Sequence, residues 1–119
     1  MFEALLKDVV ESTDGGVSSL VMDLDGIALD SYSKPGATFD IKTIGIELSV
    51  VLRSIRQAAD MLGAGEAREM SLVSDRVTTI VRLLEQNYFV ALSLEPGGNV
   101  GKGRYLLRTR AGELNAELS

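Results

Sequence analysis

The sequence predicts an α/β (α+β) sandwich, in which a five-stranded antiparallel sheet carries a long helix on one face and two terminal helices on the other. Apolar residues recur at helical spacing in three segments, near the beginning, in the middle and at the end of the chain. Five β-rich runs lie between these segments and are separated by turn residues. The element order is therefore α-β-β-α-β-β-β-α. The 119 residues contain no evident linker or repeat, so we expect one domain, residues 1–119.

The first third of the chain predicts a short helix followed by a β-hairpin. In residues 1–12 the apolar side chains share one helical face and the charged side chains lie on the other. Residues 17–33 then form two β-rich runs that meet at Asp25-Gly26, which is a strong hairpin signal. The same segment is similar to the start of a calcium loop, but that loop requires a Glu at its twelfth position, where Lys34 stands. We therefore expect a tight turn.

The middle of the chain predicts the long helix. Pro35-Gly36 interrupts the preceding strand, Thr38 or Asp40 caps the helix, and Gly63 terminates it just after Leu62. One face of the helix is predicted to pack on the sheet, and its apolar residues are Ile41, Ile44, Leu48, Val51, Leu52, Ile55, Ala59 and Leu62.

The opposite side of this helix carries a second, mixed stripe, which we call the outer stripe. It consists of Ile46, Val50, Arg53, Gln57 and Met61. A helix face that meets solvent is expected to be polar, and a small domain rarely exposes contiguous apolar area. The outer stripe therefore predicts a surface for a protein partner, with scattered surface apolar residues as the alternative.

Three further strands and a final helix complete the prediction. Residues 67–74, 76–85 and 87–95 form strand-like runs that indicate an antiparallel meander. The last run alternates little in polarity, which is typical of a central strand covered on both faces. Residues 100–118 again show helical spacing and are expected to cover the sheet.

The first strand of the meander adds to the predicted interface. Arg68, Met70 and Leu72 lie on one of its faces, and Glu69 and Ser71 lie on the other. Such a mixture is typical of an edge strand. An edge strand has unpaired backbone groups, so it can pair with another chain.

Composition excludes several classes of function. The chain has no His and no Cys, which removes imidazole chemistry, Ser-His-Asp and Cys-His nucleophiles, disulfides and zinc sites. The remaining reactive groups form no convergent set, so we expect no enzyme, no cofactor and no metal. A net charge of −5 disfavours nucleic acid. No signal peptide and no run of about 18 apolar residues is present, so we expect no membrane insertion and a cytoplasmic location.

The glycine-rich stretch EPGGNVGKGR, residues 95–104, is only superficially similar to a phosphate-binding loop. That loop requires a glycine where Pro96 stands and a magnesium-binding hydroxyl where Gly103 stands. We therefore expect a turn between a buried strand and the final helix. The alternative function is a small anion- or ligand-sensing domain that uses the backbone of the loop from Gly97 to Gly103.

Four stretches, in this order, make the chain resemble the roadblock/dynein light chain family along its whole length. They are GGVSSLVMDLDGIAL, GIELSVVLRSIRQAADMLGAG, SDRVTTIVRLL and NYFVALSLEPGGNVGKGRYLL. Family members tend to enter the final helix through an Asn-Leu-Gly-type turn followed by an Arg, and Asn99-Val100-Gly101 with Arg104 is similar. Among bacterial forms, the chain looks like the MglB and MglC type.

This resemblance implies a function as well as a fold. Members of the family are noncatalytic, dimerise through the long helix and the third strand, and regulate small Ras-like GTPases or act as adaptors. The MglB and MglC type works with the GTPase MglA in cell polarity and gliding motility. The resemblance therefore implies a homodimer, or a mixed assembly with an MglB-type partner, that uses the outer stripe and Arg68, Met70 and Leu72. Only Ser119 follows the final helix, without the tail common in MglB-type regulators, so we expect an MglC-like adaptor.

Overall fold

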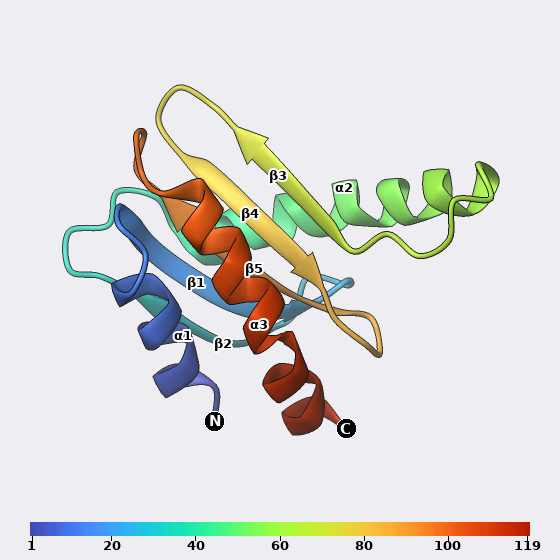
Figure 1. Cartoon of the computed structure of the whole chain (residues 1–119), viewed down its shortest axis with the longest axis horizontal. Helices are drawn as coiled ribbons and strands as arrows, with labels where there is room; N and C mark the ends of the chain where they lie inside the picture. Colours follow the sequence, from blue (N-terminus) through green and yellow to red (C-terminus); the bar gives the residue numbers. More distant parts are fainter.

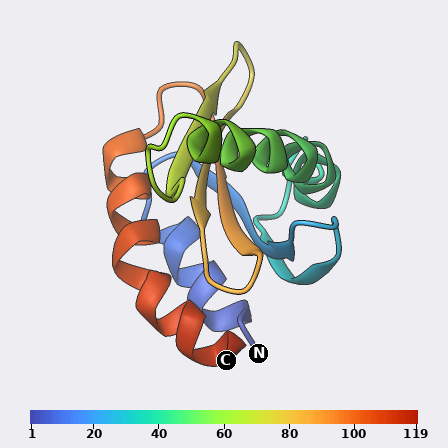
Figure 2. The same cartoon turned by 90° about the vertical axis from the view of Figure 1, so that its right-hand side faces the viewer.

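A five-stranded antiparallel sheet lies between one long helix and two terminal helices, as the sequence predicts (Figures 1 and 2). The computed structural model describes residues 1–119. Its elements are α1 (Glu3–Glu11), β1 (Gly16–Asp23), β2 (Ala28–Ser33), α2 (Ile41–Met61), β3 (Glu69–Val73), β4 (Thr78–Leu83), β5 (Tyr88–Leu94) and α3 (Val100–Leu118). This order confirms the predicted one, and β3, β4 and β5 are slightly shorter at both ends than predicted.

The strand order in the sheet is β2-β1-β5-β4-β3, which places β5 in the centre and β3 at one edge. Every residue of β5 after Tyr88 is buried, and this confirms the expected central strand. The hairpin between β1 and β2 turns at Asp25-Gly26, where Gly26 has a φ of 90°. The Asp23 carboxylate accepts hydrogen bonds from the N–H groups of Asp25 and Ile27 and so stabilises this turn.

The face of the sheet that α1 and α3 cover, which we call the closed face, carries the larger hydrophobic cluster. The buried members of this cluster are Phe2, Leu6, Val9, Val10, Val21, Ile80, Val90, Leu92, Leu94, Leu106, Leu107 and Leu114. Gly103 allows α3 to lie close to the sheet, because a Cβ atom there would stand only 3.0 Å from side-chain carbons of Ile80 and Leu92. Gly103, which stands where a phosphate-binding loop requires a hydroxyl, therefore has a packing role.

The opposite face of the sheet, which we call the open face, is covered by α2 alone (Figure 2). Its buried cluster consists of Leu20, Met22, Leu24, Ile41, Leu48, Leu52, Val81, Phe89 and Ala91. At Gly45 the helix approaches β1 closely, since a Cβ atom there would lie 2.7 Å from a Leu20 methyl carbon and 2.9 Å from Met22 Cε. The C-terminal part of α2 extends beyond the sheet (Figure 1).

Candidate interaction surface

The start and end of α2 are set by local signals. The Asp40 carboxylate accepts a hydrogen bond from the Lys42 N–H at 3.0 Å, so Asp40 is the helix cap and Thr38 is not. Gly63 follows the helix with a φ of 63°, a conformation that glycine adopts readily. These two residues fix the length of the helix that carries the outer stripe.

The rotation of α2 about its axis differs in part from the prediction. The helix buries Ile41, Gly45, Leu48, Ser49 and Leu52. The expectation that Val51 and Leu62 pack on the sheet was wrong, because both are exposed, Leu62 by 80%. The close contact at Gly45 explains the exposure of Val51, because it turns the glycine side of the helix toward β1 and moves Val51 outward. Leu62 is exposed because it follows the part of α2 that extends beyond the sheet.

The outer stripe lies on the surface of the molecule. Ile46 is 50% exposed, Val50 54% and Met61 81%, and Arg53 and Gln57 are also exposed. No residue of α2 beyond Leu52 is buried. The chain itself therefore does not cover the outer stripe, which remains available to another molecule.

The edge strand β3 places residues on the open face of the sheet, which is also the face that α2 covers. It pairs only with β4, so its other edge has no strand beside it. Met70 stands opposite Val81, and Leu72 is two residues further along, so both point to the open face. Leu72 is half exposed, whereas Met70 packs partly against the core of its own chain. Arg68 lies just before the strand, and its carbonyl oxygen accepts a hydrogen bond from the Leu83 N–H.

The structure places the outer stripe and the β3 residues on one side of the molecule without joining them. No hydrogen bond or ion pair connects the two groups. Two exposed residues near the outer stripe were not predicted as part of it, namely Glu47 and Phe39. Glu47 adjoins Ile46 in the sequence, whereas Phe39 precedes the helix cap Asp40, so helical spacing could not place it.

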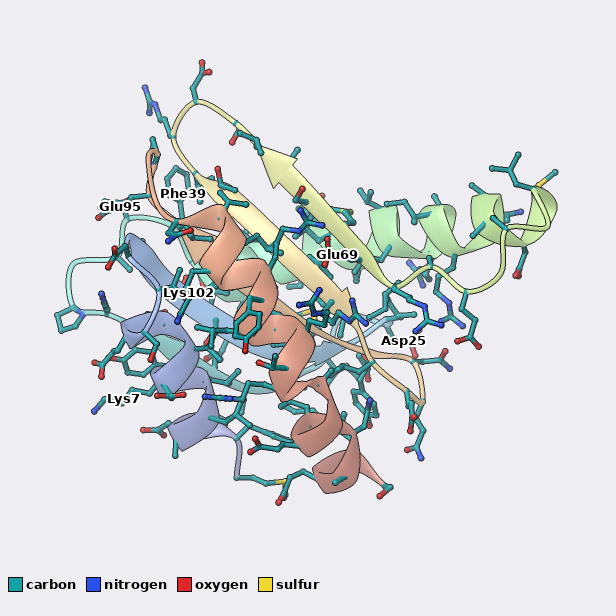
Figure 3. All side chains as sticks on the ribbon, in the orientation of Figure 1. Lys7, Asp25, Phe39, Glu69, Glu95 and Lys102 are labelled. Atoms are coloured by element: carbon teal, nitrogen blue, oxygen red, sulfur yellow. The ribbon has the colours of Figure 1, made fainter.

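Two arginines of α2 hold both hairpin turns at one end of the sheet. Arg53 lies 3.8 Å from the carboxylate of Asp25, which Figure 3 labels, and both side chains are largely exposed. Arg56 donates a hydrogen bond of 2.7 Å to the side-chain oxygen of Asn87 in the turn between β4 and β5. A polar pocket of about 340 Å³ lies between these turns. Two carboxylates, Asp23 and Asp25, line the pocket together with these two arginines, so it does not present a net charge for a ligand.

Two arginines of α3 are engaged within the chain. Arg104 donates from Nε to the Glu69 carboxylate at 2.7 Å, and Arg82 lies 3.9 Å from the same carboxylate (Glu69 is labelled in Figure 3). The Glu69–Arg104 pair connects the closed side of β3 to the N-terminal part of α3. Arg110 donates to Asp8 at 2.9 Å, and this hydrogen bond lowers the pKa of Asp8 below its usual value.

The glycine-rich loop uses most of its donors internally. The Asn99 N–H donates to the Asp14 carbonyl at 2.8 Å, and the Asn99 side chain accepts from the Lys102 N–H and caps α3. Further N–H groups of the loop that donate within the chain are those of Gly98, Val100 and Gly103. An anion site requires a row of free N–H groups, so this geometry does not favour the anion-sensing alternative.

Other chemistry has little support in this arrangement. No group of carboxylates comes together that could hold a metal ion. None of the helices is both long enough and apolar enough to cross a membrane. What the molecule offers is an exposed surface of apolar and charged side chains on α2, next to an edge strand that has one unpaired side.

The solved structures that are similar to this chain include several roadblock-type proteins. The structure of MglC from Myxococcus xanthus is 38% identical in sequence, with 98% of each chain covered and a TM-score of 0.70. A roadblock/LC7 domain from Streptomyces avermitilis has a TM-score of 0.85 at 14% identity, covering 98% of this chain and 96% of that one. Two MglB structures, that of the gliding protein from Thermus thermophilus and one with a tetrameric arrangement, have TM-scores of 0.81 and 0.82. Both are 19% identical and cover 96% of this chain and 84% of theirs. No family model and no curated protein matches the sequence.

Proposed function

We propose that this chain, which belongs to the roadblock family and to its MglB- and MglC-like members, is a noncatalytic adaptor or regulator. It acts with a small Ras-like GTPase of the MglA type, and with a roadblock partner of the MglB type, in bacterial cell polarity and gliding motility. It functions in the cytoplasm as one roadblock domain, residues 1–119, and forms a homodimer. The similarity to MglC favours the adaptor role over direct activation of the GTPase.

The observation that carries this proposal is the uncovered outer stripe. Ile46, Val50 and Met61 are at least half exposed on a helix whose other side completes the core. Free apolar surface of this kind, beside an edge strand, is typical of a protein-protein interface. Together with Arg68, Met70 and Leu72, the outer stripe is the proposed interface for a second roadblock chain.

Co-elution with candidate partners tests the proposal. The chain is mixed with the MglB-type and MglA-type proteins of the same organism, and the complexes are separated by size-exclusion chromatography with light scattering. We expect a complex with the MglB-type protein, and we expect Ile46→Asp to abolish it. Tyr105→Asp is the matched control, because Tyr105 is also about half exposed but lies on α3, on the closed face. Equal loss of binding in both variants, or no complex in the wild type, would contradict the proposal.

A second measurement addresses the alternative function. Thermal unfolding is followed with and without nucleotides and inorganic phosphate. We expect no shift, because most of the loop donors are already used within the chain. A specific rise of several degrees would favour anion sensing instead.

A further inference from the structure

A groove on the closed face lies between the two terminal helices. α1 and α3 lie side by side and run in roughly opposite directions, so both ends of the chain lie at one end of the molecule (Figures 1 and 2). A hollow of about 680 Å³ opens between them. The apolar residues that line it are Met1, Phe2, Ala4, Leu5 and Ala116. Leu5 packs against the closed-face cluster but is only partly buried, so the groove exposes apolar surface that is continuous with the core.

An ion pair connects the two helices along this groove. Arg110 of α3 donates a hydrogen bond to Asp8 of α1 at 2.9 Å, and both residues line the hollow. From Arg110 the groove continues along α3 to Glu117, a distance of about 10 Å at the helical rise per residue. Ala4 and Ala116 keep this part open, because each carries a single methyl group. The groove is therefore long enough for about two turns of a further helix.

The charged side chains that line the groove do not balance. Three of them are carboxylates, namely Asp8, Glu113 and Glu117, and one is the guanidinium of Arg110, which leaves a net charge of −2. Glu113 and Glu117 are exposed and form no ion pair within the chain. Since Arg110 already donates to Asp8, these two carboxylates are available to cations of another molecule.

The end of α3 adds to the negative potential of the groove. The last carbonyl groups of a helix carry partial negative charge, and the last turn of α3 contains no basic residue. The Met1 ammonium also lines the groove, but it lies 3.5 Å from the Asp30 carboxylate, which balances it. A molecule that fits the groove is therefore apolar on one side and positively charged at the positions that face Glu113 and Glu117.

We propose that the groove between α1 and α3 binds a basic amphipathic helix of a partner protein. The apolar face of that helix packs on Ala4, Leu5 and Ala116. Lys or Arg residues four positions apart in the partner stand opposite Glu113 and Glu117, which are themselves four positions apart on α3. This inference goes beyond the proposed function, because the groove lies on the opposite face of the sheet from the outer stripe and both surfaces can be occupied together.

Other occupants fit the groove less well. A free anion meets two uncompensated carboxylates, and like charges repel. An uncharged apolar ligand leaves Glu113 and Glu117 without a partner beside it. The pocket between the hairpin turns provides a contrast within the same chain, because its lining is mostly polar and its charges balance. Only the groove between α1 and α3 combines an apolar lining with an excess of one charge.

Peptide binding tests the proposal. The probe is a labelled peptide of about 14 residues, or four helical turns, with leucines on one helical face and lysines along its edge. Fluorescence anisotropy is expected to show binding to the wild type. The double variant Glu113→Lys, Glu117→Lys is expected to bind at least about tenfold more weakly, because two attractive contacts become repulsive. Absence of binding to the wild type would overturn the proposal.

Two controls separate the groove from general attraction between opposite charges. Glu66→Lys with Glu95→Lys changes the net charge equally at exposed carboxylates that do not line the groove (Glu95 is labelled in Figure 3). This variant is expected to bind the peptide within about twofold of the wild type, since distant exposed charges are screened. A peptide of the same composition in scrambled order lacks the apolar face and is expected to bind weakly. Equal weakening in both double variants, or equal binding of both peptides, would contradict the proposal.

Filling the groove measures the apolar contribution. Ala116→Phe places a ring in the hollow and is expected to weaken peptide binding about tenfold by steric exclusion. Thr109→Phe is the matched control, because Thr109 is exposed on α3 but does not line the groove. Circular dichroism verifies that both variants fold. Equal affinities of the two variants for the peptide would contradict the proposed site.

Ile46→Asp separates this inference from the proposed function. The variant is expected to bind the peptide as the wild type does, since Ile46 lies on the open face. Loss of peptide binding in Ile46→Asp would mean that the peptide binds the outer stripe and that the groove is not the site. If the peptide binds in the groove but the wild type forms no complex with the MglB-type protein, only the proposed function is wrong.

Discussion

The two faces of the sheet are completed in different ways. On the closed face, α1 and α3 both pack against the strands, and Arg110 of α3 reaches Asp8 of α1. On the open face, α2 is the only helix, and it has no fully buried residue after Leu52. The chain thus satisfies one face by itself and leaves part of the other uncovered. We infer that stability resides mainly on the closed face and that recognition of a second roadblock chain resides on the open face.

Leu107→Ala is expected to give the largest effect. Leu107 is buried in the closed-face cluster, so its truncation removes apolar contacts and leaves a cavity, lowering the free energy of unfolding by about 2–5 kcal/mol. Leu72→Ala on the open face is the matched comparison, because Leu72 is half exposed. In dilute solution its effect is expected to stay within about 0.5 kcal/mol. Urea unfolding of both variants measures the two changes in the free energy of unfolding. Equal decreases would contradict the inference that stability resides mainly on the closed face.

Gly45→Ala tests the close approach of α2 to β1. The added Cβ would meet side-chain carbons of Leu20 and Met22 at less than 3.0 Å, so we expect a loss of about 1–3 kcal/mol from overpacking. Gly112→Ala in α3 is the control, since nothing lies within 4 Å of its added Cβ. At position 112, alanine is expected to raise the free energy of unfolding by up to about 1 kcal/mol, because its helix propensity is higher than that of glycine. The midpoint temperature of unfolding should fall in Gly45→Ala and rise in Gly112→Ala. A rise in Gly45→Ala would contradict the close packing of α2 on β1.

Substitution of Asp30 is expected to have a smaller effect on stability, and this effect depends on pH. Its carboxylate on β2 accepts hydrogen bonds from the Phe2 N–H at the start of α1 and from the Ser31 N–H. Partial burial opposes its charge, but these hydrogen bonds and the Met1 ammonium outweigh burial and hold its pKa below the usual value. A lowered folded-state pKa stabilises the protein above the unfolded pKa of about 3.9, and this contribution is lost as the pH falls through the folded value.

Asp30→Asn is therefore expected to lower stability by about 1 kcal/mol at pH 7. The difference from the wild type should shrink below about pH 4 and disappear in stronger acid, where the wild-type carboxyl is also neutral. Denaturant unfolding at several pH values measures this difference. A deficit that stays constant across the acid range would mean that the charge of Asp30 has no part in it.

Local signals in the sequence predicted much of this fold. The Asp40 cap, the Asp25-Gly26 turn and the central and edge positions of β5 and β3 all depend on residues close together in the chain. The rotation of α2 was not predictable in this way, because it depends on the fit of Gly45 against Leu20 and Met22, which are distant in sequence.

The same distinction applies to the interaction surface. Helical spacing alone was sufficient to predict that Ile46, Val50 and Met61 are opposite the packed side, and they are exposed. The Glu69–Arg104 pair that fastens β3 was not predicted, since it joins residues on separate elements. The left-handed conformation of Gln86 and Asn87, with φ values of 59° and 66°, was not predicted, because it depends on the hairpin that they close.

We propose that the open face associates with a second copy of the chain through the outer stripe. Light scattering across a range of concentrations tests it most directly, on the wild type and on Ile46→Asp, with circular dichroism as a check of folding. We predict about twice the chain mass of 12.8 kDa for the wild type, and the single-chain mass with an unchanged spectrum for the variant. A wild type that remains at 12.8 kDa at about 100 μM, well above the micromolar range of ordinary specific association, would contradict the claim.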